Sequence, residues 1–365
     1  MRKWHQNLLI GLLAISLAAC SGPELTRDIQ VANPTQPTTA IPEPTPKLTS
    51  TPTSTPTPTP QELVDEGEMA LFVGDYDVAY QIFSDALTQS SDEKSAAQSH
   101  LGLGQAFFMQ ENYGLALIHL RDAANADEAI IAARAQYLLG QCYTQLNRYE
   151  EALGAYEGYL ELRPGVIDSH VYELQGDLFS TLGNPSQAIE TYQKAYLTNP
   201  DGGAENIEVK IARAYQDTGD LETALSLYKD IYNNSTNDYT KAQMGLLIGR
   251  IYEADGELEQ ASSYYQNAVT NYPFAFDAFT ALTALENAGI DVNEYQRGLV
   301  HYYRGNHNLA IEAFDLYIEE APTDFADSAL YFKALSTRAI RDNQGAIALW
   351  ESLIEDYPAS TYYVD

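Results

Sequence analysis

Residues 169–200 read SHVYELQGDLFSTLGNPSQAIETYQKAYLTNP, and this stretch decides the fold. An apolar face at helical spacing is centred on Gly176, the turn formers of residues 183–185 interrupt it, and Ala188 and Tyr192 begin a second face. The pattern predicts two antiparallel helices. Small side chains at Gly176 and Ala188 let the helices cross closely, and Tyr192 is expected to fill the space between neighbouring hairpins.

The same arrangement recurs along the chain. Its register alanines follow one another every 36 or 37 residues with one step of 49, and they are Ala79, Ala116, Ala152, Ala188, Ala224, Ala261, Ala310 and Ala346. A small residue stands twelve positions before each of them: Gly67, Gly104, Gly140, Gly176, Ala212, Gly249, Gly298 and Ala334. A large residue stands four positions after: Phe83, Leu120, Tyr156, Tyr192, Tyr228, Tyr265, Phe314 and Trp350. A period in this range predicts a solenoid of stacked repeats, an architecture that serves binding more than catalysis.

The pattern resembles that of tetratricopeptide repeats, from residue 60 to residue 358. A turn glycine recurs as Gly74, Gly183, Gly219, Gly256 and Gly305, and a closing proline as Pro164, Pro200, Pro273, Pro322 and Pro358. The resemblance implies an all-α fold, a right-handed superhelix of about eight helical hairpins whose concave groove binds proteins or peptides. We expect the step of 49 residues to hold an inserted helix at about residues 274–290.

The N-terminal part predicts export and anchoring. Residues 1–19 have a basic start and a short apolar run, as in a secretory signal peptide. Leu17-Ala18-Ala19-Cys20 resembles the lipobox of bacterial lipoproteins, which implies lipidation at Cys20 and a place outside the cytoplasm on a cell membrane or outer membrane. The alternative is an ordinary signal peptide that contains a cysteine. Residues 20–60 are rich in Thr and Pro and predict an extended tether, or else a ligand for a proline-reading domain. Residues 61–365 form the repeat domain.

Composition narrows the class of partner. The chain has 51 acidic and 20 basic residues, a net charge of −31, and removal of residues 1–19 takes away two basic residues and no acidic one. This charge argues against nucleic acid as a partner. No phosphate-binding loop, paired-Cys metal site or pair of histidines at four-residue spacing occurs. We therefore predict a protein that is not an enzyme, with no cofactor and no metal, and with Cys142 as a small buried residue.

The candidate groove residues stand eleven positions before the register alanines: Gln105, Gln141, Asp177, Arg213, Arg250, Leu299 and Leu335. Lys210 lies one helical turn before Arg213. Three cations in one region of an acidic chain predict a site for an anion, such as a peptide carboxylate. The alternative is that they neutralise Asp177, Asp217 and Glu253. Farther along, the same face turns aromatic with Tyr302 and Tyr331, which form either a second contact surface or packing for the inserted helix.

The region from Val292 to Pro358 resembles the helical superhelix that precedes the catalytic domain of soluble-type lytic transglycosylases. Those enzymes use a glutamate in a Glu-Ser context followed by a Gly-Leu-Met-Gln-like stretch. Glu351-Ser352 lies inside a repeat helix and no such stretch follows, so the resemblance does not carry catalysis.

Two functions are therefore open. The first is a lipid-anchored scaffold that binds proteins or peptides at the bacterial cell envelope. The second is the arm of a transglycosylase that contacts peptidoglycan, with its catalytic domain outside this chain. Residues 359–365 read as the start of a further helix. We thus expect the apolar side of the last hairpin to be covered by a partner or a second copy, or the chain to be an N-terminal fragment.

Overall fold

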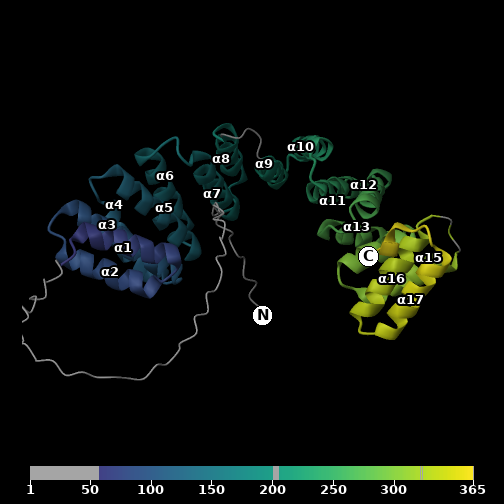
Figure 1. Ribbon diagram of the computed structural model, residues 1–365. Helices are drawn as coiled ribbons and strands as arrows, with labels where there is room; N and C mark the ends of the chain where they lie inside the picture. The colour runs from purple at the N-terminus through teal and green to yellow at the C-terminus, as the bar shows by residue number, and fades with distance from the viewer. Residues whose placement is uncertain (1–56, 200–204, 321, 323, 365) are drawn as a thin grey trace, which may run out of the picture. The chain divides into compact units, whose positions relative to one another are not determined.

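The computed structural model describes residues 57–199, 205–320, 322 and 324–364 (Figure 1). This part of the chain contains seventeen α-helices and the short 3-10 helix η1 (Thr361–Val364), and it contains no strand. Cys20, the predicted signal peptide, most of the Thr/Pro-rich linker and Pro200 lie outside the described residues. The predicted all-α fold is confirmed.

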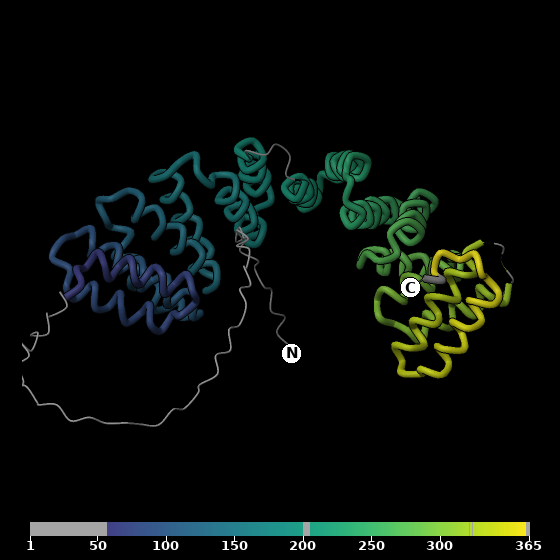
Figure 2. The backbone as a smooth tube through the Cα atoms, in the orientation of Figure 1, coloured from purple at the N-terminus to yellow at the C-terminus, as the bar shows by residue number. Residues whose placement is uncertain are grey.

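Sixteen of the helices pair into eight consecutive hairpins, which Figure 2 shows as successive coils of the backbone tube. The pairs are α1 (Pro60–Val73) with α2 (Tyr76–Gln89), α3 (Glu93–Met109) with α4 (Tyr113–Ala124), α5 (Ala129–Gln145) with α6 (Tyr149–Leu162), α7 (Asp168–Thr181) with α8 (Pro185–Leu197), α9 (Glu205–Thr218) with α10 (Leu221–Asn234), α11 (Asp238–Ala254) with α12 (Leu258–Asn271), α14 (Glu294–Tyr303) with α15 (His307–Glu319), and α16 (Ala326–Ala339) with α17 (Asn343–Asp356). The remaining helix is α13 (Phe276–Asn287), which lies where the inserted helix was expected.

One turn geometry joins the two helices of every hairpin. The residue five before each register alanine has a left-handed backbone, at Gly74, Glu111, Asn147, Gly183, Gly219, Gly256, Gly305 and Arg341. The next residue is the N-cap of the second helix, and its backbone N–H donates to the carbonyl five residues upstream at 2.8 to 3.1 Å. This bond ends the first helix as in a Schellman motif. The glycines were visible in the sequence and asparagine tolerates this conformation at Asn147, whereas Glu111 and Arg341 adopt it against their preference.

The repeat residues form the core of each hairpin. All eight register alanines are at most 2 % exposed. The structure corrects the expected role of Tyr192, because its ring lies against Gly176 of its own hairpin, where a Cβ would collide with it. Gly140 makes the same room for Tyr156. The large residue thus packs first against its own hairpin, and Phe83 also lies against Gly102 of the following hairpin.

Helix α13 has no second helix of its own. It packs against α11 and α12, and it buries Ala278, Ala281, Leu282 and Leu285 in a core shared with those helices. The turn that follows α13 has the same geometry as the turns within the hairpins, since Gly289 has a φ of 67° and the N–H of Ile290 donates to the carbonyl of Leu285 at 3.0 Å. The helix therefore extends the row of first helices beyond α11.

The last hairpin leaves much of α17 exposed within the described residues. This helix buries only Ala346 and Leu353, while Ile347 is 53 % and Ile354 is 48 % exposed. Among the described helices none has the length and apolarity that a membrane crossing requires.

Candidate ligand-binding groove

The predicted groove positions differ in exposure. Arg213 and Arg250 are exposed, Gln141 and Asp177 are half-buried, and Leu299 lies in the core around Tyr295 and Phe314. The position eleven residues before the register alanine therefore lies at the surface in the middle of the repeat array. For Leu299 the predicted groove position is wrong, because this side chain is buried. The middle of the array is also where the predicted cations lie, on α9 and α11.

Lys210 is neutralised by the hairpin before it. Its Nζ lies 2.7 Å from Glu173 Oε1 and 2.7 Å from Asp177 Oδ1, both on α7. The ammonium group also lies 5.7 Å from the centroid of the Tyr192 ring, whose hydroxyl donates to Asp177 at 2.8 Å. For Lys210 the structure thus supports neutralisation of neighbouring acids, one of the two interpretations of the sequence.

Arg213 and Arg250 are in a different state. Within the described residues neither guanidinium has a carboxylate within ion-pair distance. Both arginines act electrostatically on Asp277 of α13, which is half-buried. Burial raises the pKa of Asp277, and the charges of Arg213 and Arg250 oppose that rise. Helices α9, α11 and α13 therefore bring two exposed cations and one poorly solvated carboxyl group close enough to interact electrostatically.

A cavity of about 520 Å³ lies beside Arg250, between α11, α12 and α13. Its apolar wall is formed by Leu246, Phe276 and Phe279, and Thr280, Thr283 and Asn287 add polar groups. Glu253 also lines it, but its carboxylate accepts a hydrogen bond of 2.8 Å from the hydroxyl of Tyr265. A second guanidinium, that of Arg304, lies 4.7 Å from the centroid of the Phe276 ring. The cavity thus combines an apolar wall with cations, which suits an apolar side chain next to a carboxylate.

Gln141 is already engaged within its own hairpin. Its Nε2 donates to the hydroxyl of Tyr137 at 2.9 Å, and that hydroxyl lies 3.2 Å from Nε2 of His170 on α7. A ligand would have to replace this bond. Gln141 lies two hairpins before Arg213, so the structure does not bring it to the two arginines.

Tyr302 and Tyr331 belong to an aromatic cluster of the last two hairpins. The Tyr302 ring lies 4.9 Å from that of Phe332, and the Tyr331 ring stacks at 4.6 Å on Tyr362 of η1. Contact with the inserted segment is made by Tyr303, 6.1 Å from Phe274. Tyr331 also lines a cavity of about 340 Å³ with Trp350, Leu353 and Tyr362. Most of these rings pack against one another, so the cluster is mainly core with one aromatic opening.

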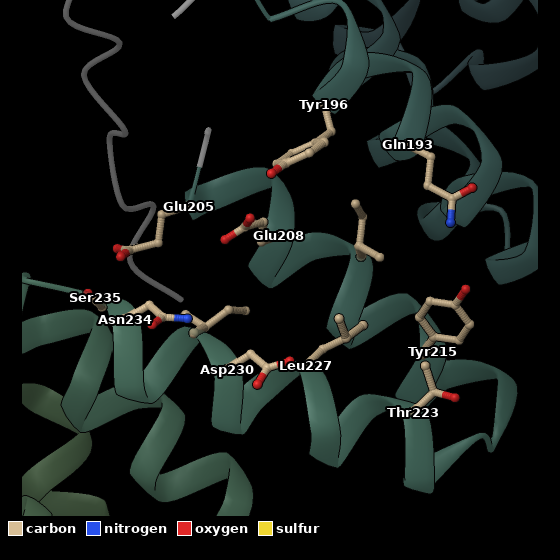
Figure 3. A pocket seen from close by; sticks show the side chains of 12 residues that line it. Gln193, Tyr196, Glu205, Glu208, Tyr215, Thr223, Leu227, Asp230, Asn234 and Ser235 are labelled. Atoms are coloured by element: carbon tan, nitrogen blue, oxygen red, sulfur yellow. The ribbon is translucent and has the colours of Figure 1, made fainter. Parts of the chain in front are cut away.

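A crevice that the repeat register does not predict lies between α8, α9 and α10. It has a volume of about 570 Å³, and Figure 3 shows Glu205, Glu208 and Asp230 around it. Tyr196 and Tyr215 contribute aromatic walls. Glu205 accepts a hydrogen bond of 2.6 Å from Thr240 on α11, so part of this negative charge is used between hairpins. The crevice is suited to a basic side chain and not to an anion.

Two other residues singled out in the sequence carry no chemistry of their own. Cys142 is buried, and burial raises the pKa of its thiol to about 12. Glu351 is exposed in the interior of α17, and the hydroxyl of Ser352 next to it donates to Asp356 at 2.8 Å. In the described part of the chain, no group of three or more His, Cys, Asp or Glu side chains is placed to hold a metal ion.

Comparison with protein families supports the repeat assignment. Tetratricopeptide repeat models match residues 169–201 and residues 209–276. The model described as subunit 3 of the anaphase-promoting complex, or cyclosome, matches residues 73–159. No curated protein sequence matches the chain.

Several solved structures are similar to parts of the chain at low identity. PilF of Pseudomonas aeruginosa is 21% identical, with a TM-score of 0.44, over 62% of this chain and 97% of its own. YrrB, described as a tetratricopeptide repeat protein with an unusual peptide-binding site, is 21% identical with a TM-score of 0.44, over 56% of this chain and 97% of its own. The protein MamA is 21% identical with a TM-score of 0.42, over 48% of this chain and 90% of its own.

Proposed function

Because this chain contains tetratricopeptide repeats, we propose that it is a non-enzymatic scaffold that binds a peptide segment of a partner protein. The binding surface is formed by α9, α11 and α13, with Arg213 and Arg250 as contacts for carboxylates. One observation carries this proposal: in a chain with 51 acidic and 20 basic residues, these two exposed guanidinium groups have no ion pair within the described residues.

The chemistry of the surface specifies the segment. A guanidinium binds a carboxylate through two parallel hydrogen bonds, and such a pair is strongest where water is partly excluded. The cavity beside Arg250 offers that exclusion together with the rings of Phe276 and Phe279. The segment should therefore carry an acidic group next to an apolar side chain. The rest of the acidic surface repels most other anions, which restricts binding to this surface.

The test is a selection of random peptides against the full repeat domain, followed by anisotropy titration of the selected peptides. We expect enrichment of acidic residues beside apolar ones, and a loss of at least tenfold in affinity for Arg213→Glu with Arg250→Glu. A matched double variant, Lys194→Glu with Arg341→Glu, makes the same charge change on exposed residues outside the surface. Equal loss in both double variants would leave only a general effect of charge and would refute the site.

The scaffold is proposed to act at the cell envelope, held by lipid on Cys20. The support is the lipobox-like sequence Leu17-Ala18-Ala19-Cys20 and the Thr/Pro-rich segment that follows it. Acyl chains on the cysteine give the attachment that the negative charge of the chain does not. Expression of Cys20→Ser should move the protein from the membrane fraction to the soluble fraction. Retention of this variant on membranes would refute lipid anchoring at Cys20.

A second candidate is the peptidoglycan-binding arm of a lytic transglycosylase. It is supported by the resemblance of residues 292–358 and by the aromatic opening of Tyr331, Trp350 and Tyr362. Sedimentation with isolated peptidoglycan separates the two functions. Retention that is lost in Trp350→Ala would favour the arm, and absence from the pellet would favour the peptide-binding scaffold.

A further inference from the structure

Helix α9 carries opposite charges on two of its faces. Glu208, Ile211 and Tyr215 follow one another at helical spacing and line the crevice between α8, α9 and α10. Lys210 and Arg213 stand on another face, and at about 100° per residue Arg213 is about 140° around the helix axis from Glu208. The crevice is therefore separate from the surface of α9, α11 and α13 on which the proposed function rests.

The carboxylates of the crevice have no cation among the described residues. Glu205 and Glu208 of α9 and Asp230 of α10 line the cavity (Figure 3), and none of them is in an ion pair within that part of the chain. Glu205 accepts a hydrogen bond of 2.6 Å from Thr240, and the hydroxyl of Tyr196 donates to Glu208. These neutral donors leave each carboxylate its negative charge and further lone pairs. Like charges in one cavity repel one another, so a cation there relieves repulsion as well as adding attraction.

The rest of the crevice is apolar. Ile211, Leu227 and Ile231 contribute aliphatic side chains, of which Ile231 is buried. The rings of Tyr196 and Tyr215 stand on different sides of the cavity (Figure 3), and an aromatic face attracts a guanidinium or ammonium group. The volume of about 570 Å³ lies within the range of ligand pockets, about 300–1,000 Å³. The crevice therefore has room for a cationic side chain together with an apolar neighbour.

We propose that this crevice binds a basic segment of a partner protein, in which an arginine is flanked by apolar residues. The guanidinium pairs with Glu208 and Asp230 and lies against the ring of Tyr196, while the apolar neighbour packs on the aliphatic side chains. Arginine suits the site better than lysine, because its planar group stacks on a ring and binds carboxylates through paired hydrogen bonds. Charge complementarity selects this occupant. A second copy of the chain is a poor source of it, since the chain has only 20 basic residues against 51 acidic ones.

The test uses a library of labelled decapeptides, each with a central arginine and random flanking residues, titrated by anisotropy against the full chain carrying Cys20→Ser. The best binders are then remade with citrulline, which replaces the guanidinium by a neutral group of nearly the same shape. We expect apolar residues to be enriched beside the arginine and citrulline to reduce affinity by roughly tenfold or more. The double variant Glu208→Gln with Asp230→Asn should lose affinity for the arginine peptides to a similar extent.

The matched control is the double variant Asp217→Asn with Glu222→Gln. These two carboxylates are exposed on the same two helices, α9 and α10, and neither lines the crevice. The control should keep the affinity within about twofold at physiological salt, because charges farther than about 8 Å are largely screened. Tyr196→Leu should weaken binding several-fold, whereas Tyr196→Phe retains the ring and should retain the affinity.

Three results would overturn the proposal. Equal affinity for the arginine and citrulline peptides would mean that the crevice recognises no cation. Equal loss in both double variants would leave only a general effect of charge. Spermine that binds as tightly as the peptides would make the crevice a site for small polyamines, since spermine has no apolar neighbour to recognise. Circular dichroism of each variant establishes that the helices are intact.

This test and that of the proposed function can fail independently. The surface with Arg213 and Arg250 is tested with acidic peptides, and the crevice is tested with basic ones. Each set of variants changes side chains of one surface only.

Discussion

Gly140 lies against the ring of Tyr156, so closely that a Cβ on the glycine would stand 2.5 Å from Cε1 of the tyrosine. Gly67 and Phe83 have the same relationship at 2.8 Å, and Gly298 and Phe314 at 2.5 Å. Protein interiors are packed too densely to absorb such an overlap without movement. In the repeats that carry glycine at this position, the glycine is therefore required by the large residue sixteen positions later.

Gly140→Ala should destabilise the protein. The new methyl group has to displace the buried Tyr156 ring, and overpacking of this kind costs about 1–3 kcal/mol. The shift of the urea unfolding midpoint measures it. Gly154→Ala on α6 is the control, since a Cβ there meets nothing within 4 Å and alanine is favoured over glycine in a helix by about 0.5–1 kcal/mol. If both variants shifted stability in the same direction, the packing argument would be wrong.

Glu111→Gly and Arg341→Gly should each stabilise the protein. Their φ angles are 59° and 70°, and the left-handed conformation costs most residues about 1–2 kcal/mol that glycine does not lose. The gain is reduced by the greater freedom of glycine in the unfolded chain. Gly219→Ala, at a φ of 85°, should show the opposite sign. Thermal unfolding of the three variants provides the comparison, and a destabilised Glu111→Gly would contradict it.

The thiol of Cys142 should not react in the folded protein. Its pKa is raised from 9.0 to about 12 by burial, so at pH 8 the thiolate fraction falls by about three orders of magnitude. An aromatic disulfide reagent should label the Cys20→Ser variant only after denaturant is added. Labelling of the native protein at the rate of a free thiol would mean that the region around α5 opens readily.

Stability should fall as the solution becomes acidic through the range in which His119 titrates. Burial lowers its pKa below the ordinary value of 6.5, so between the lowered value and 6.5 the unfolded chain binds more protons than the folded chain. The free energy of unfolding therefore rises with pH in this window and decreases as pH falls. His119→Gln should flatten the dependence of the urea midpoint between pH 5 and pH 7. An unchanged slope would assign the dependence to other groups.

The repeat register made most of the fold predictable. The alanines, the small and large partners and the extra helix α13 all follow from spacing, because each hairpin repeats one set of local contacts. The turns at Glu111 and Arg341 were not predictable, since those residue types do not favour a left-handed backbone and the repeat imposes it.

The candidate site was predictable only in part. Spacing placed Arg213 and Arg250 on the surface, but whether a cation is paired depends on side chains of neighbouring hairpins. Lys210 is an example, because Glu173 and Asp177 reach it from α7. The Nδ1 atoms of His100 on α3 and His119 on α4 lie 3.1 Å apart, and this contact likewise depends on how one helix rotates against the next, which a single helical period does not specify. Lipidation at Cys20 stays a prediction.

The unpaired helix α13 has a consequence for how the array melts. In a solenoid each hairpin is stabilised by its own folding and by coupling to its neighbours. Helix α13 couples well to α11 and α12, but α14 meets α12 and α13 through a small interface. The free energy of coupling between neighbouring elements is therefore small between α13 and α14. The joint between α6 and α7 is small as well. Unfolding that begins in the last two hairpins should therefore stop at α13, and the protein should lose its helices in more than one cooperative step.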